Sequence, residues 1–102
     1  KPEIKWNKNR NELKEIVKVQ REIMENAWQY LKQGGTMVYS TCTLNKEENE
    51  QNIEWFLNKH KNCTLEKVFI GNGDNLRDEN GMLTVLPNEY MDGFFIAKLK
   101  KI

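Results

Sequence analysis

The chain has 102 residues, and its 16 basic and 15 acidic side chains leave a net charge of +1, which does not by itself mark a nucleic-acid binder. No apolar run approaches the about 20 residues needed to cross a bilayer, and no secretory signal opens the chain. Two cysteines and one histidine are too few for a structural zinc site, so we expect a small cytoplasmic domain, or part of one, without a disulfide or a metal.

The first predicted helix follows a loop. Residues 1–10 show no helical or strand periodicity, whereas residues 11–33 place apolar side chains at three- and four-residue spacing, which predicts an amphipathic helix. Asn11 suits the N-cap position, and Gly34 and Gly35 suit a left-handed helix end. The apolar stripe comprises Leu13, Ile16, Val17, Ile23, Met24, Ala27, Trp28 and Leu31.

A predicted strand and a second predicted helix meet close to a cysteine. Residues 36–42 are rich in β-branched and aromatic types and too few for a helix, which predicts a strand buried on both faces. Asn45 and Glu48 have the spacing of a capping box, which predicts a helix over residues 46–60. Cys42 would then lie at the carboxyl end of a strand, where ligands bind in open α/β sheets, and beside a helix amino terminus, which stabilises a thiolate.

The remaining residues predict two more strands separated by a long loop. Residues 64–70 and 93–100 have strand character, and the charged end of the second, through Lys101, is expected to leave the core for solvent. Residues 71–92 carry turn-forming types without a period of their own and predict a loop. The whole order predicts an α/β fold of three strands and two long helices. A central strand as apolar as residues 36–42 needs a further neighbour, so we expect this chain to be part of a larger domain.

The placement of Cys42 leaves three interpretations open. It is a small buried apolar residue, an activated nucleophile, or a metal ligand, the last disfavoured by the lack of partners. His60 lies at the far end of the second predicted helix, about 20 Å away at 1.5 Å per residue, so a catalytic pair of Cys42 and His60 is not expected. Cys63 is expected to be structural.

Three segments of the sequence together resemble one family. They are Lys-Pro-Glu-Ile-Lys-Trp at residues 1–6, Gly-Gly-Thr-Met-Val-Tyr-Ser-Thr-Cys-Thr at residues 34–43 with Glu-Asn-Glu at residues 48–50, and Asp-Gly-Phe-Phe-Ile-Ala-Lys at residues 92–98. Their order and spacing closely resemble the carboxyl-terminal part of the bacterial Sun family. Members of that family are S-adenosylmethionine-dependent methyltransferases that make 5-methylcytosine in small-subunit ribosomal RNA.

The resemblance implies a fold and a role for Cys42. The chain would be the carboxyl-terminal portion of a Rossmann-like methyltransferase domain, with its last strand inserted antiparallel between the other two. Cys42 would attack carbon 6 of cytosine and so make carbon 5 nucleophilic. The family's glycine-rich loop, its cofactor-binding acidic residue and its second cysteine would all precede Lys1. S-adenosylmethionine would therefore be bound mainly outside this fragment, and the fragment alone is expected to be inactive and monomeric.

Contact with ribosomal RNA is the least specific expectation. Lys5, Trp6 and Arg10 form a basic and aromatic cluster that could touch phosphates or bases, although a solvated loop also fits these residues. Family members often carry a histidine where Asn88 stands, so a role tied to that histidine is not expected here. The alternative function is a free-standing protein-interaction module without catalytic activity, which docks a partner through its exposed helix face.

Overall fold

The computed structural model describes residues 10–68, 76–79, 81–87 and 93–102. It contains the elements α1 (Arg10–Tyr30), β1 (Thr36–Thr41), α2 (Glu50–Lys59), β2 (Cys63–Glu66), β3 (Leu76–Glu79), β4 (Met82–Val85) and β5 (Phe94–Lys101). The α/β class and the two helices are confirmed. The prediction of three strands is wrong, because residues 71–92, expected to be a loop, include β3 and β4. Residues 69 and 70 of the predicted strand 64–70 lie outside the described residues.

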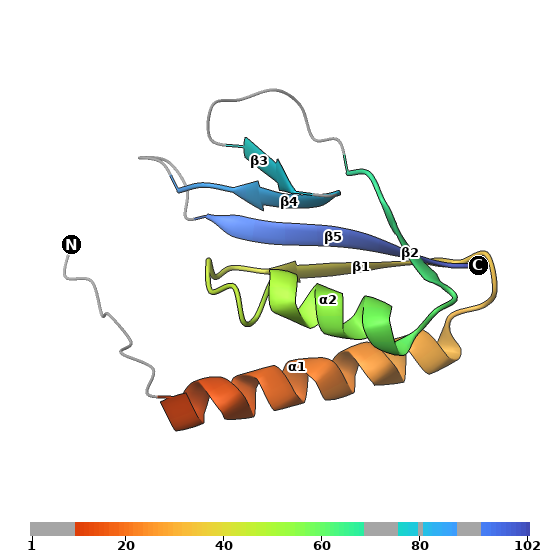
Figure 1. The fold of residues 1–102 in the computed structure, drawn as a ribbon, viewed down its shortest axis with the longest axis horizontal. Coiled ribbons are helices and arrows are strands. Elements are labelled where there is room, and N and C mark those ends of the chain that lie inside the picture. The colour runs from red at the N-terminus through yellow and green to blue at the C-terminus, as the bar shows by residue number, and fades with distance from the viewer. Residues whose placement is uncertain (1–9, 69–75, 80, 88–92) are drawn as a thin grey trace.

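β5 lies inside the sheet, and all its pairings are antiparallel (Figure 1). One side pairs with β1, from Thr36 opposite Lys100 to Thr41 opposite Phe95. The other side pairs with β2 near its end and with β4 near its start. The insertion of the last strand between the two earlier strands, implied by the resemblance, is therefore confirmed.

The unexpected strands β3 and β4 form a tight hairpin. Glu79 pairs with Met82, so the two residues between them are Asn80 and Gly81. Gly81 has φ +94°, a left-handed conformation that glycine adopts without a steric penalty. An Asn-Gly dipeptide is the residue pair that two-residue hairpin turns prefer.

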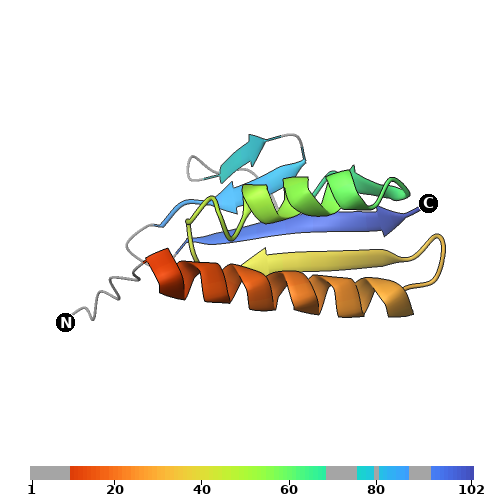
Figure 2. The same cartoon turned by 60° about the horizontal axis from the view of Figure 1, so that its bottom comes forward.

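Both helices pack on one face of the sheet (Figure 2). The core joins the inner sides of the two helices to alternate residues of β5, because successive side chains of a strand point to opposite faces. The buried members of this core are Met24, Trp28, Ile53, Phe56, Cys63, Met82, Phe95, Ala97 and Leu99. The aromatic rings of Trp28 and Phe56 meet edge to face at 5.1 Å and fix the contact between α1 and α2.

Two predictions of burial are wrong. β1 is not buried on both faces, since Met37 and Tyr39 turn toward the helices while Val38, on the opposite face, remains 57% exposed. In α1 the predicted stripe is wider than the buried one, and Ile23 is 62% exposed. The physical reason is that the two helices cover a single face of the sheet, and α1 meets that face only along the side of Met24 and Trp28.

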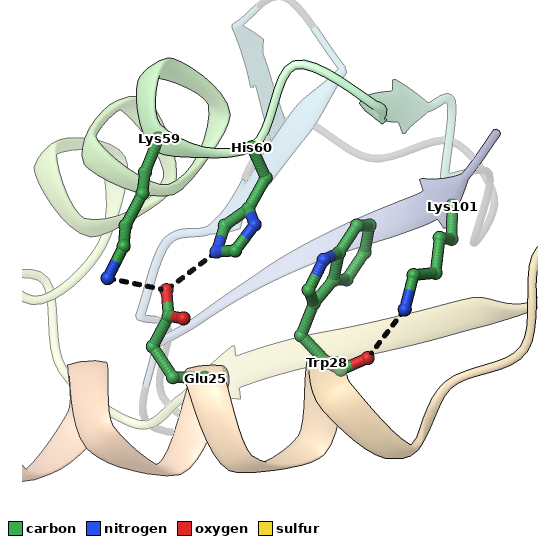
Figure 3. Close-up of polar contacts among 5 residues, drawn as sticks. All are labelled: Glu25, Trp28, Lys59, His60 and Lys101. Atoms are coloured by element: carbon green, nitrogen blue, oxygen red, sulfur yellow. Dashed lines mark hydrogen bonds and ion pairs between the residues drawn. The ribbon is translucent and has the colours of Figure 1, made fainter.

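Polar contacts tie α1 to β5 and to α2 (Figure 3). Nζ of Lys101 donates to the carbonyl oxygens of Trp28, at 2.9 Å, and Leu31, at 2.8 Å. The carbonyl of Trp28 also accepts from the backbone N–H of Leu31 at 3.1 Å, so Lys101 adds a charged donor at the end of α1 and caps the helix. The prediction that Lys101 points to solvent is wrong. Oε1 of Glu25 lies 2.7 Å from Nε2 of His60 at the end of α2.

Candidate active site

Cys42 comes directly after β1, and its thiol is free and exposed. The interpretation of Cys42 as a small buried residue is therefore wrong. The prediction that a helix amino terminus lies beside Cys42 in the sequence is also wrong, because α2 begins at Glu50 and residues 43–49 form the connection. In the part of the chain that the structure describes, no group of three or more His, Cys, Asp or Glu side chains is placed to hold a metal ion.

The connection after Cys42 is held by Asn49, whose side chain is 1% exposed. Its Nδ2 donates to the carbonyl oxygen of Thr43 at 2.8 Å, and its Oδ1 accepts from the hydroxyl of Thr41. Both residues that flank Cys42 in the chain are thus bound to one buried carboxamide. Asn49 also occupies the N-cap position of α2, although its side chain makes no capping hydrogen bond there.

The predicted capping box is not formed. Nδ2 of Asn45 donates to Oε2 of Glu48 at 2.8 Å, so the pair interacts through its side chains instead of capping the backbone. The carbonyl oxygen of Asn45 accepts from the backbone N–H groups of Glu48 and Asn49. A hydrogen-bonded turn over residues 46–49 therefore takes the place of the first predicted helical turn.

A buried polar network lies beneath this turn and joins β1 to both helices. The phenol of Tyr39 donates to the backbone carbonyl of Glu48 at 2.6 Å and accepts from Nδ2 of Asn52 at 3.1 Å. Asn52 also donates to Gln20 and accepts from Arg21, both on α1. Burial raises the pKa of Tyr39 above its usual value of 10.0, and the bond from Asn52 opposes that rise. Tyr39 is therefore a neutral hydrogen-bonding group at physiological pH.

Gly93 packs closely against the same end of the sheet. A Cβ atom at this position would lie 2.7 Å from the carbonyl oxygen of Val85, 3.0 Å from Cδ of Pro87 and 3.1 Å from Cδ2 of Leu44. These contacts explain why the start of β5 needs a glycine, because a backbone carbonyl cannot yield as a flexible side chain can. Leu44 is two residues beyond Cys42, so this packing extends to the connection that carries the thiol.

The other residues considered from the sequence lie apart from Cys42. Cys63 is buried in the core, and burial raises its thiol pKa to about 11, which agrees with a structural role. The ring of His60 packs against Phe56 at 4.4 Å. Figure 3 shows its contact with Glu25. Lys5 and Trp6 lie outside the described residues, and Arg10 is the first residue of α1, so their contact with RNA stays a prediction.

Three glycines of the described residues lie in turns or in a closely packed position. Gly34 is in the turn before β1, at the end opposite to Cys42, and Gly81 is in the β3–β4 hairpin. The space at Gly93 is already filled by Val85, Pro87 and Leu44. In the described part of the chain, no helix is long and apolar enough to span a membrane.

Solved structures define the class of fold. A methyltransferase homologue from Pyrococcus horikoshii matches with a TM-score of 0.79 at 32% identity, over 93% of this chain and 34% of that one. NSun6 from the same organism, solved with SFG, matches with a TM-score of 0.75 at 35% identity, over 93% of this chain and 24% of that one. The two helices and the sheet therefore correspond to part of a methyltransferase structure.

Sequence comparison gives the particular family. A family model described as 16S rRNA methyltransferase RsmB/F matches residues 1–100. The chain is 44% identical over 92 residues to ribosomal RNA small subunit methyltransferase F of Cronobacter sakazakii, covering 85% of this chain and 19% of the relative. It is 39% identical over 101 residues to methyltransferase B of Pectobacterium atrosepticum, covering 98% of this chain and 22% of the relative. The chain belongs to the 16S rRNA methyltransferase RsmB/F family, and it spans only a small part of these relatives.

Proposed function

We propose that this chain is the carboxyl-terminal part of the catalytic domain of an enzyme that forms 5-methylcytosine in small-subunit ribosomal RNA, and that Cys42 is its nucleophile. One observation carries the proposal: the cysteine of the Thr-Cys-Thr motif is exposed at the end of β1, whereas Cys63 is buried. Family membership over residues 1–100 supports the class of reaction. The substrate makes the cytoplasm the expected location of the enzyme.

The proposed chemistry at Cys42 is covalent attack on the base. The thiolate forms a bond to carbon 6 of cytosine, and the electron pair of the C5–C6 double bond moves to carbon 5, which becomes nucleophilic. Carbon 5 would use that electron pair to bond the methyl group, whose bond to the sulfonium sulfur of the donor breaks. A base then removes the proton from carbon 5, the electrons of the C5–H bond re-form the C5–C6 double bond, and the C6–S bond breaks with its electron pair on sulfur, which restores the thiolate. The target base must leave its stack for carbon 6 to reach Cys42.

The methyl donor in this proposal is S-adenosylmethionine, which supplies the methyl group when bound. It would be held by segments of the full-length enzyme that this chain does not include, as would the second cysteine that assists product release. The same segments would cover the exposed apolar side chains Ile23 and Val38. That explanation is favoured over a free-standing interaction module, because the chain spans only 19% and 22% of the two curated relatives named above.

The experiment that tests this proposal is covalent trapping of the full-length enzyme on RNA with 5-fluorocytosine at the target position. The adduct should map to Cys42, and Cys42→Ala should abolish both the adduct and methyl transfer while cofactor binding stays near normal. Cys63→Ala is the matched control, since that thiol is buried away from the end of β1, and it should retain turnover. Substantial turnover by Cys42→Ala would sink the assignment of the nucleophile.

A further inference from the structure

Asn49 bonds to the residues on both sides of Cys42, to the side-chain hydroxyl of Thr41 and to the backbone carbonyl of Thr43. The carbonyl oxygen of Thr43 can only accept a hydrogen bond, so the amide nitrogen of Asn49 must face it, at 2.8 Å. This fixes the orientation of the carboxamide and leaves Oδ1 facing Thr41, whose hydroxyl is therefore the donor. Every strong contact that an asparagine side chain offers here is directed at the residues before and after the exposed thiol.

Asn49 is itself rigidly placed. Its backbone N–H donates to the carbonyl of Asn45 at 3.1 Å, and its own carbonyl accepts from Ile53, a fully buried residue of α2. A side chain that is 1% exposed has no water to replace a lost partner, so its two hydrogen bonds fix it in one geometry. The position of the Cys42 backbone is thereby coupled to the start of α2.

We infer that Asn49 is a positioning residue, which holds Cys42 in the geometry needed for attack on the base; this rests on the proposed function of Cys42. Attack requires the sulfur to meet carbon 6 at about 3–3.5 Å with aligned orbitals, and a displacement of about 1 Å costs on the order of 100-fold in rate. The thiol is exposed and follows the end of the strand, so its neighbours in the chain must provide the rigidity.

The test compares Asn49 with Asn52 in the full-length enzyme. Asn52 is the matched control, because it is equally buried and lies in α2, the helix whose N-cap position Asn49 occupies. Its side chain bonds to Gln20, Tyr39 and the carbonyl of Glu48 instead of to the residues flanking Cys42. Asn49→Ala should lower kcat about 10- to 100-fold with little change in KM for RNA. Asn49→Ala should slow adduct formation on 5-fluorocytosine RNA by the same factor as kcat. Asn52→Ala should lower the melting temperature while kcat, measured below that temperature, stays within about threefold of wild type.

Asn49→Asp keeps the shape of the side chain, so it tests the positioning role of Asn49 even if Asn49→Ala does not fold. An ionised carboxylate cannot donate to the carbonyl of Thr43, whereas a protonated carboxyl can. The ratio of variant to wild-type kcat should therefore rise as the pH falls from about 8 to about 6. With kcat expressed per folded enzyme, from circular dichroism at each pH, a defect in folding alone predicts no such rise.

The outcomes separate this inference from the proposed function. Wild-type kcat in Asn49→Asp with a flat pH ratio, or equal losses of kcat in Asn49→Ala and Asn52→Ala, overturn the role of Asn49. If those results occur while Cys42→Ala is inactive, only the inference fails. Turnover by Cys42→Ala overturns the proposed function itself, whatever the Asn49 variants do.

Discussion

Nζ of Lys101 donates a hydrogen bond of 2.9 Å to the carbonyl oxygen of Trp28, which lies 73 residues earlier in the chain. The same ammonium group donates to Leu31 and lies 5.0 Å from the centre of the Trp28 ring. A cation at the end of a helix also interacts favourably with the helix dipole. The side chain of Lys101 on β5 thus caps the end of α1, a helix that lies far from β5 in the sequence.

Replacing Lys101 with methionine should destabilise the full-length protein by about 1–3 kcal/mol, because two helix carbonyls lose a charged donor while the apolar stem is kept. Lys100→Met is the control, since Lys100 only forms a surface ion pair with Glu66 at 3.7 Å and should change stability by at most about 1 kcal/mol. Thermal melting of both variants measures the difference. Equal melting temperatures for Lys101→Met and Lys100→Met would show that the cap contributes nothing.

Gly93→Ala should lower methyl transfer as well as stability, by about 1–3 kcal/mol for the latter, because the new methyl group overlaps the Val85 carbonyl and presses on Leu44. Gly34→Ala is the comparison: it has open space but φ +86°, and it lies at the opposite end of β1 from Cys42. It should cost about 1 kcal/mol and leave kcat unchanged. Melting curves and steady-state kinetics distinguish the two. A Gly93→Ala enzyme with wild-type kcat contradicts the link from Gly93 to the Cys42 connection.

The two cysteines should differ sharply in alkylation. Burial raises the pKa of Cys63 to about 11, so at pH 8 only about one thiol in a thousand is ionised, and the folded core also shields it. In the native protein the rate of alkylation at Cys63 should still rise with pH between about pH 9 and pH 11. In urea the rate of alkylation should level off above about pH 9. Iodoacetamide labelling followed by peptide mass spectrometry gives both rates. The exposed Cys42 should react first, and native labelling of Cys63 at its urea rate would contradict this prediction.

The isolated 102-residue chain should give no saturable binding of S-adenosylmethionine at micromolar concentrations. The reason is that the glycine-rich loop and the acidic residue that the family resemblance assigns to cofactor binding would precede Lys1. Isothermal titration calorimetry measures this, with the full-length protein as positive control. A clear isotherm for the isolated chain would mean that the cofactor site has been misplaced.

The sequence predicts the elements whose pattern is strong and local. Residues 11–33 and 36–42 are close to α1 and β1, because helical spacing and β-branched composition act within one element. The antiparallel insertion of β5 came from family resemblance, since periodicity does not determine which strands pair. The hairpin was missed because its polar first strand has no period, although Asn80 and Gly81 carried a usable turn signal.

The candidate site could be predicted only in part. The Thr-Cys-Thr motif singled out Cys42 as the candidate. The Glu-Asn-Glu segment gave no sign of which of its three residues would contact the residues that flank Cys42. Asn49 bonds to Thr41 and Thr43 because residues 46–49 form a hydrogen-bonded turn and α2 begins only at Glu50. Where the helix begins depends on buried tertiary contacts. The burial of β1 was overestimated, because amino-acid composition does not reveal whether helices cover one face of a sheet or both.

The antiparallel pairing of β5 with β1 has a consequence for synthesis on the ribosome. β1 forms its ladder with residues 95–100, so at least 54 residues must follow Thr41 before that pairing can begin, by the arithmetic 95 − 41 = 54. Non-local pairings of this kind form late, because the intervening chain must first be ordered. The strand that precedes Cys42 therefore stays unpaired on this edge while α2 emerges, and a nascent chain released before β5 would leave that edge open to aggregation.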